Sequence, residues 1–178
     1  MITQPITAKA RALRTEQVIL FRVSGQLFAI SSASVQEVRG VDSLAGSASA
    51  LSVAEVPKVR HLVHRGDRSF FVVSAATHFG LPAAPGLLVF ILRKTRTALL
   101  IDGIEKMATM TRLQALPQAF CSEERQWYRG LTDLDQNVIP VVQPEGFLTA
   151  SELTLLENVA GTHGPGRGLE AGIAGTAS

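Results

Sequence analysis

Short apolar segments separated by turn residues recur along most of this chain, and they limit the folds that are open to it. Residues 18–23 are rich in β-branched and aromatic side chains, Ser24 and Gly25 form a turn signal, and residues 27–30 are apolar again. Two short apolar runs around such a turn are typical of a β-hairpin. Further strands are expected at residues 59–63, 70–73, 87–93, 97–102, 104–110, 128–134 and 138–142. Many short strands at close spacing indicate small β-barrels or a sandwich.

The stretches between these strands carry weaker signals. Residues 35–41 predict a short helical turn that leads into a strand, because apolar side chains recur there three positions apart. Residues 43–54 are rich in serine and alanine and predict a loop. Residues 77–81 predict a short irregular or helical link, and residues 111–126 predict a long connection.

One α-helix is well marked near the C-terminal end. Thr149 precedes Glu152 by three positions, which is the spacing of a capping box at a helix start. An apolar stripe at roughly helical spacing follows, made of Leu153, Leu155, Leu156 and Val159. Gly161 is expected to end the helix. The apolar stripe of this helix is expected to pack on a barrel.

Length and composition place these elements in one folded unit. A chain of 178 residues forms one domain, or two small ones that share a core. We expect a flexible arm at residues 1–15, a folded domain at residues 16–160 and a disordered, glycine-rich tail at residues 161–178. No apolar run approaches the ~20 residues of a membrane span, and the first 15 residues do not resemble a secretory signal. We therefore expect a cytoplasmic protein.

Catalytic patterns are weak in this sequence. His61 and His64 have a spacing that would suit a metal on a helix, but their segment is predicted to be extended. His78 and Cys121 could join them only through the fold, so a metal or thiol enzyme is the less favoured alternative. Nucleic-acid binding is disfavoured by scattered charges and an aromatic content of 6%. A small all-β domain without a recognisable active site is expected to act by binding.

Several segments, taken in order, resemble one known family. Residues 35–40 read V-Q-E-V-R-G, which is similar to the V-Q-E-I-R-G segment of the chemotaxis coupling proteins of the CheW family. The other segments that resemble the family are residues 18–30, 51–57, 63–66, 98–104, 127–131 and 138–142. The resemblance implies a mainly all-β fold of two five-stranded SH3-like barrels that share a hydrophobic core, with a short C-terminal α-helix.

The same resemblance implies a function and its partners. It implies a non-enzymatic scaffold without cofactor or metal, which couples the cytoplasmic tip of a chemoreceptor to the regulatory domain of a CheA-type histidine kinase. It implies neither nucleic-acid binding nor direct insertion into a membrane. Position by position, the receptor-binding groove would involve Val35, Glu37, Val38 and Arg65, and the kinase or ring contact would involve Phe120.

All of these residues except Glu37 also have a purely structural interpretation, which the sequence leaves open. Val35, Val38 and Phe120 are equally well explained as core residues. Arg65 is equally well explained as a structural arginine that satisfies turn carbonyls.

This sequence departs from the family pattern in three places. Residues 71–75 read F-V-V-S-A where the family has P-V-V-D-L, and the segment 58–64 is shorter and lacks a glycine. Ala115 and Leu116 stand where a basic residue is expected before Phe120. These departures motivate an alternative, a divergent interaction module of a specialised chemosensory system, such as one that controls pili or surface motility.

Overall fold

Residues 14–162 are described by the structure, a computed structural model. Arg14 and Thr15 are exposed and have no regular structure. Most of the predicted arm, residues 1–13, and most of the predicted tail, residues 163–178, lie outside the described residues.

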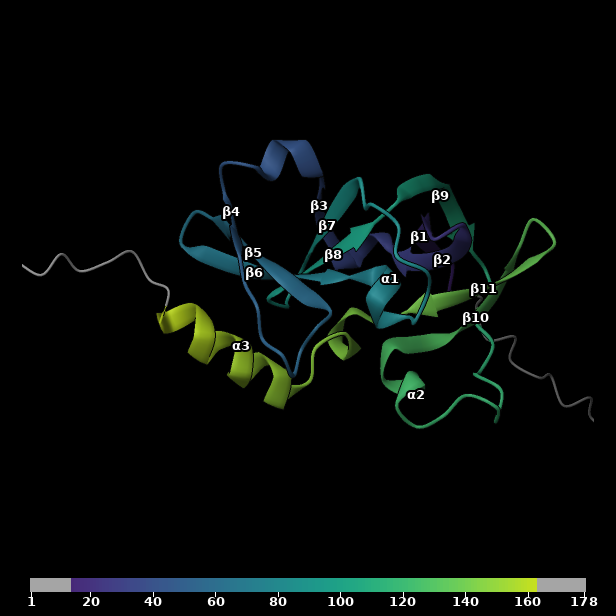
Figure 1. Ribbon diagram of the computed structural model, residues 1–178. Helices are drawn as coiled ribbons and strands as arrows, with labels where there is room; N and C mark the ends of the chain where they lie inside the picture. The colour runs from purple at the N-terminus through teal and green to yellow at the C-terminus, as the bar shows by residue number, and fades with distance from the viewer. Residues whose placement is uncertain (1–13, 163–178) are drawn as a thin grey trace, which may run out of the picture.

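Two β-sheets form the framework of the described residues (Figure 1). In spatial order, the first sheet holds β10 (Tyr128–Leu134), β11 (Asn137–Val142), β2 (Gln26–Ser31), β1 (Glu16–Val23) and β9 (Gly103–Met110). The second holds β3 (Val35–Gly40), β7 (Leu88–Leu92), β8 (Thr97–Ile101), β6 (Arg68–Ser74), β5 (Val59–Arg65) and β4 (Ala48–Ala50). The helical elements are η1 (Ser32–Ser34), η2 (Val41–Leu44), α1 (Ala75–His78), α2 (Glu124–Trp127), η3 (Pro144–Gly146) and α3 (Ala150–Thr162).

The first sheet curls until its two ends meet. Gln114, which follows β9, exchanges two backbone hydrogen bonds with Leu131 of β10, at 2.7 and 2.9 Å. Gly130 permits this approach, because a Cβ atom there would lie 2.3 Å from the Gln114 carbonyl oxygen. Arg129 adds a two-pronged ion pair to Glu16 at the start of β1, with N–O distances of 2.9 and 3.0 Å. These contacts give the sheet the closed form of a barrel.

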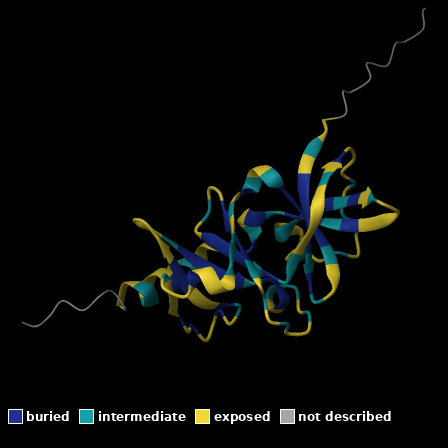
Figure 2. Cartoon of the chain, turned by 90° about the horizontal axis from the view of Figure 1, so that it is seen from above, coloured by how far each residue is buried: buried dark blue, intermediate teal, exposed yellow. Residues whose placement is uncertain are grey.

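Three apolar clusters fill the molecule. The largest lies between the sheets and takes residues from both, including Phe21 and Phe28 of the first sheet and Phe71 and Phe90 of the second. A smaller cluster lies on the other face of each sheet. Buried segments gather toward the middle of the molecule, and exposed residues gather at the outer turns (Figure 2). The predicted all-β fold of two SH3-like units with a shared core is confirmed.

Some local predictions were wrong. The helical turn expected within residues 35–41 lies just before them, as η1, because Val35 to Gly40 pair with β7. The loop expected at residues 43–54 contains the end of η2 and the strand β4, which pairs with β5 and gives the second sheet a sixth strand. Gly161 does not end α3 but lies in its last turn.

Helix α3 begins at the predicted capping box. The Glu152 backbone N–H donates to Thr149 Oγ1 at 3.2 Å, and the Thr149 N–H donates to Glu152 Oε2 at 2.9 Å. Leu156 is fully buried, and Leu153 and Val159 are packed against the shared core. Leu155, expected in the same stripe, is instead 39% exposed.

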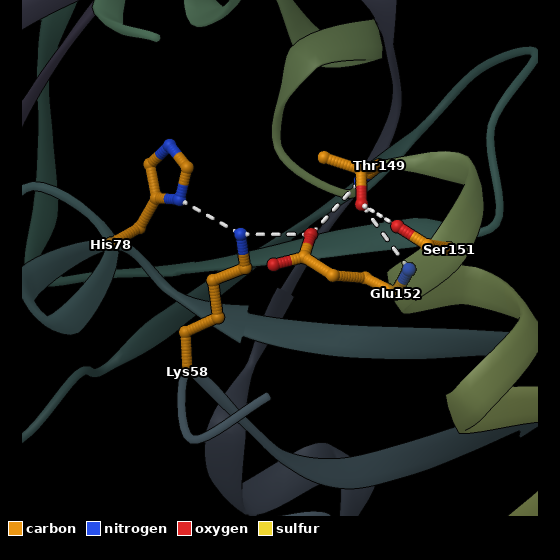
Figure 3. A network of polar contacts seen from close by, with 5 residues as sticks. All are labelled: Lys58, His78, Thr149, Ser151 and Glu152. Carbon is orange, nitrogen blue, oxygen red and sulfur yellow. Dashed lines mark hydrogen bonds and ion pairs between the residues drawn. The ribbon is translucent and has the colours of Figure 1, made fainter. Parts of the chain in front are cut away.

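A polar network joins the start of α3 to Lys58, which precedes β5, and to His78 of α1 (Figure 3). Lys58 Nζ lies 3.1 Å from Glu152 Oε2 and 3.4 Å from His78 Nδ1. The His78 ring contacts Trp127 and Phe147, with ring centroids 4.4 and 5.1 Å apart. Because an ammonium group can only donate, Nδ1 must accept and Nε2 must carry the proton. That buried N–H has no hydrogen-bond partner within the described chain, and only the surrounding rings can offer it a weak contact.

We expect His78 to make the protein sensitive to acid. Burial, and secondarily the Lys58 charge, lower the pKa of His78 to about 3, below its ordinary value of 6.5. The unfolded chain therefore takes up this proton first as the pH falls. The stability that the neutral His78 contributes is complete above pH 6.5 and is lost between pH 6.5 and about 3. The free energy of unfolding falls there by up to about 1.4 kcal/mol per pH unit.

Urea unfolding of His78→Asn, which keeps an acceptor near Lys58, should show a flatter dependence of the free energy of unfolding on pH over this range. The exposed His64 supplies the control variant, His64→Asn. Equal slopes in wild type and His78→Asn would contradict this prediction.

A second prediction concerns the docking of α3. Leu156→Ala should lower the free energy of unfolding by about 2–5 kcal/mol, because it leaves a cavity in the shared core. Leu155→Ala, one position earlier on the exposed side, should cost less than about 1 kcal/mol. Equal losses in chemical unfolding would show that the helix packs through another face.

Candidate functional site

A β-bulge in the edge strand β3 places Val35 and Val38, three positions apart, on the same face of the sheet. The pairing shifts between Val35, which lies opposite Leu92, and Glu37, which lies opposite Ile91. Val35 therefore faces the shared core and is only 8% exposed. Val38, opposite Phe90, lies on the same face but is 38% exposed. Val35 is therefore a core residue, and only Val38 of the two valines can contact a partner at the surface.

Glu37 and Arg65, from different strands, meet as an ion pair. Arg65 Nη2 lies 2.7 Å from Glu37 Oε2, and Arg39 Nε lies 2.8 Å from Glu37 Oε1. The Arg39 Nε–H is not aligned with the carboxylate for a hydrogen bond, so the attraction there is one of charge. Arg65 contacts Glu37 rather than a turn carbonyl, which differs from the structural interpretation of that residue. A partly exposed pair contributes at most about 1 kcal/mol to stability, so its main effect is to fix two charged groups at the surface.

Two hollows flank Leu44 beside this pair. One, of about 280 Å³, is lined by Arg39, Arg65 and His64 together with Leu44, Val63 and Ile91. The other, of about 300 Å³, lies on the far side of Leu44 and Val63 and is mostly apolar. Val41 and Leu87 lie at this end of the sheet, joined by a backbone hydrogen bond of 3.0 Å, and both are exposed.

The first sheet adds exposed apolar side chains that the sequence analysis did not single out. Met107 of β9 pairs with Ile19, and Ile104 pairs with Phe21, so both lie on the face that forms the shared core. They are only partly covered, at 55% and 41% exposed, although their strand partners Ile19 and Phe21 are buried. A bulge between Leu20 and Phe21 brings these two β9 residues, three positions apart, onto one face. Strict alternation along the sequence would have put them on opposite faces.

Val38, Ile104 and Met107 continue the shared core to the surface, one from the second sheet and two from the first. We call these three residues the flanking strip. Strands β3 and β9 lie along the same side of the molecule, at the top of Figure 1. The strip thus offers apolar side chains from both sheets, and one of them, Val38, follows Glu37, whose carboxylate is paired with Arg65.

Phe120 lies apart from this surface. Its ring meets Tyr128 edge-on, with centroids 5.7 Å apart, and it is partly exposed. Arg125 holds its loop by donating to the carbonyl oxygens of Pro117 and Phe120, at 2.6 and 3.1 Å. Burial raises the pKa of Tyr128 to about 12, so the phenol is neutral. The structure brings Glu37 and Arg65 together, and leaves Phe120 in the loop before α2, a helix that lies at the bottom of Figure 1, away from β3 and β9.

The residues considered for an enzyme do not converge. His64 Nδ1 lies 2.9 Å from Ser69 Oγ, and Cys121 is exposed. Among residues 14–162, no three histidine, cysteine or acidic side chains lie close enough to hold a metal. Within the same range, no helix has the length and apolar character needed to cross a membrane.

Comparison with known proteins points to one family. Residues 17–152 match the family model described as the CheW-like domain. A probable chemotaxis protein CheW from Rhizobium etli is 26% identical over 144 residues, covering 76% of this chain and 89% of that protein. A crystal structure of the scaffolding protein TtCheW from Thermoanaerobacter tengcongensis shares the fold with a TM-score of 0.63. It is 12% identical, and the alignment covers 78% of this chain and 96% of that one. Since the family model spans well over half of the sequence, this chain belongs to the CheW-like family.

Proposed function

We propose that this protein is a non-enzymatic scaffold of chemotaxis signalling, which couples a chemoreceptor to a CheA-type histidine kinase. The family supports a scaffolding role, since the similar structure from Thermoanaerobacter tengcongensis is that of a scaffolding protein. The observation that carries the proposal is the flanking strip, where apolar side chains of both sheets reach solvent beside a fixed ion pair.

The flanking strip suits a helical partner. An amphipathic helix binds through a few apolar anchors spaced along one face, and buried apolar contacts supply most of the affinity in such interfaces. Val38, Ile104 and Met107 can supply those contacts without disturbing the shared core. Glu37 and Arg65 would set the register and orientation of the bound helix, since rim charges favour specificity over affinity.

Phe120 is the proposed contact for the kinase regulatory domain. It lies between β9 and β10 of the first sheet, just before α2, which Figure 1 shows at the bottom of the molecule, away from β3. A receptor on the flanking strip would therefore leave Phe120 accessible, as simultaneous binding of two partners requires. Its edge-on contact with Tyr128 fixes the orientation of the ring before binding.

We expect Val38→Glu to weaken binding of a receptor cytoplasmic fragment by at least about tenfold, which corresponds to 1.4 kcal/mol. The change places a charge where an apolar anchor should be desolvated, and it should leave the free energy of unfolding nearly unchanged. Isothermal titration calorimetry measures the affinity, and Leu155→Glu is the control, because Leu155 is 39% exposed, close to the 38% of Val38, and lies on α3 rather than in the strip. Unchanged affinity of a folded Val38→Glu variant would remove the strip from the receptor contact.

Glu37→Gln tests the ion pair. It should weaken receptor binding severalfold and change the unfolding free energy by less than about 1 kcal/mol. Glu55→Gln is the matched control, because Glu55 is exposed and lies outside the ion-pair group of Glu37, Arg39 and Arg65. If stability and affinity fell together, Glu37 would be a structural residue.

Phe120→Ala should reduce binding to the kinase regulatory domain while sparing receptor binding. Both affinities can be measured on the same purified protein. Loss of both would indicate that the loop held by Arg125 had collapsed, and loss of neither would exclude Phe120 from the contact.

The departures at residues 58–75 favour the alternative of a specialised chemosensory system. Phe71 and Val73 are buried in the shared core, whereas Arg60 and His61 are exposed on β5. The departures thus reach the core at Phe71, which stands where the family has proline, and the surface at Arg60 and His61. A chain that bound a receptor and kinase of a pilus or surface-motility system, but not those of a flagellar system, would establish this alternative.

A further inference from the structure

A second surface lies where the second sheet meets α3, and the proposed function does not use it. A groove of about 360 Å³ runs between the ends of β6 and β8 and the segment that leads into α3. Its charged lining consists of Arg68, Lys94 and Arg96 against a single acid, Glu145. We call it the basic groove.

Two of its cations are held in place by aromatic rings. The Arg68 guanidinium lies 5.3 Å from the centre of the Phe70 ring, and that of Arg96 lies 5.2 Å from the Phe71 ring. Arg96 Nε also donates to the Ser69 carbonyl oxygen at 3.3 Å. Stacked guanidinium groups lose less conformational freedom on binding than free ones. The two rings lie on opposite faces of β6, Phe70 in the smaller cluster of the second sheet and Phe71 in the shared core, so each guanidinium group is restrained separately before any ligand arrives.

Acidic side chains neutralise little of the positive charge of these three groups. Arg68 and Lys94 have no acidic side chain within ion-pair distance among residues 14–162. Arg96 pairs with Glu157 at 2.5 Å, but both side chains are nearly half exposed. Such a pair is weak, so an incoming carboxylate can replace Glu157.

Apolar side chains line the remainder of the groove. Pro144 and Leu148 are buried, and Leu153 is partly buried. A nucleic-acid backbone, which is recognised mainly through its phosphate charges, would gain nothing from these groups. A free inorganic anion would leave the apolar lining unused.

We propose that the basic groove binds an acidic peptide segment of a partner protein, in which carboxylates alternate with apolar side chains. The carboxylates would lie between Arg68, Lys94 and Arg96, and an apolar side chain would contact Leu148 and Leu153. This contact is independent of the flanking strip and of Phe120.

Fluorescence anisotropy of the full-length protein tests the proposal, with a labelled peptide of alternating glutamate and leucine as the probe. The matched peptide of lysine and leucine serves as the control probe. Saturable binding of the acidic peptide alone, weakened by salt, is expected. Arg68→Glu combined with Lys94→Glu should weaken it at least tenfold. The control variant, Arg60→Glu with Arg112→Glu, reverses two exposed charges outside the groove and should change the affinity less than twofold.

Three outcomes would overturn the proposal, once thermal unfolding has shown that the variants are folded. They are equal binding of the two peptides, unchanged binding by the double variant, and tighter binding of a single-stranded oligonucleotide through the same two residues. Concentration-dependent dimers that vanish in the double variant would instead assign the groove to a second copy of this chain.

Discussion

Burial of apolar side chains between the two sheets is the interaction on which the remaining structure depends. Neither sheet hides both of its faces by itself, because each has its own smaller cluster on one face and needs the other sheet to cover the second face. Ring contacts cross this boundary, as in the edge-on pair of Phe21 and Phe90 at 5.4 Å. Helix α3 adds Leu156 to the same cluster. The relative position of the barrels, and so of every surface that spans them, is therefore fixed by packing rather than by the few exposed ion pairs.

Strands with large apolar side chains could be predicted from the sequence, because such residue types are usually buried. β4 could not, since Ala48 and Ala50 carry no such signal and the strand exists only through pairing with β5. The capping box of α3 could be predicted from the sequence, because its hydrogen bonds join residues only three positions apart. The candidate site was harder. Glu37 and Arg65 were singled out by resemblance, but Ile104 and Met107 share a face only because of a bulge, and a bulge depends on two strands at once.

The molecule separates its surfaces by the kind of group that each one displays. The flanking strip is apolar with a charged border, Phe120 is one oriented ring, and the basic groove combines stacked guanidinium groups with an apolar lining. These surfaces are built on edge strands, turns and helix ends, whereas the shared core is built on central strands. Changes at any one of them can therefore alter a partner without altering the fold.

The order of strands has a consequence for synthesis on the ribosome. The second sheet uses β3 to β8, one continuous stretch, whereas the first joins β1 and β2 to β9, β10 and β11. While the chain emerges, the β1–β2 hairpin must wait, with Phe21 and Phe28 uncovered, until the inserted barrel has been made and the later strands arrive. The hairpin that is synthesised first is completed last, and it is the part of the nascent chain for which protection by a chaperone matters most.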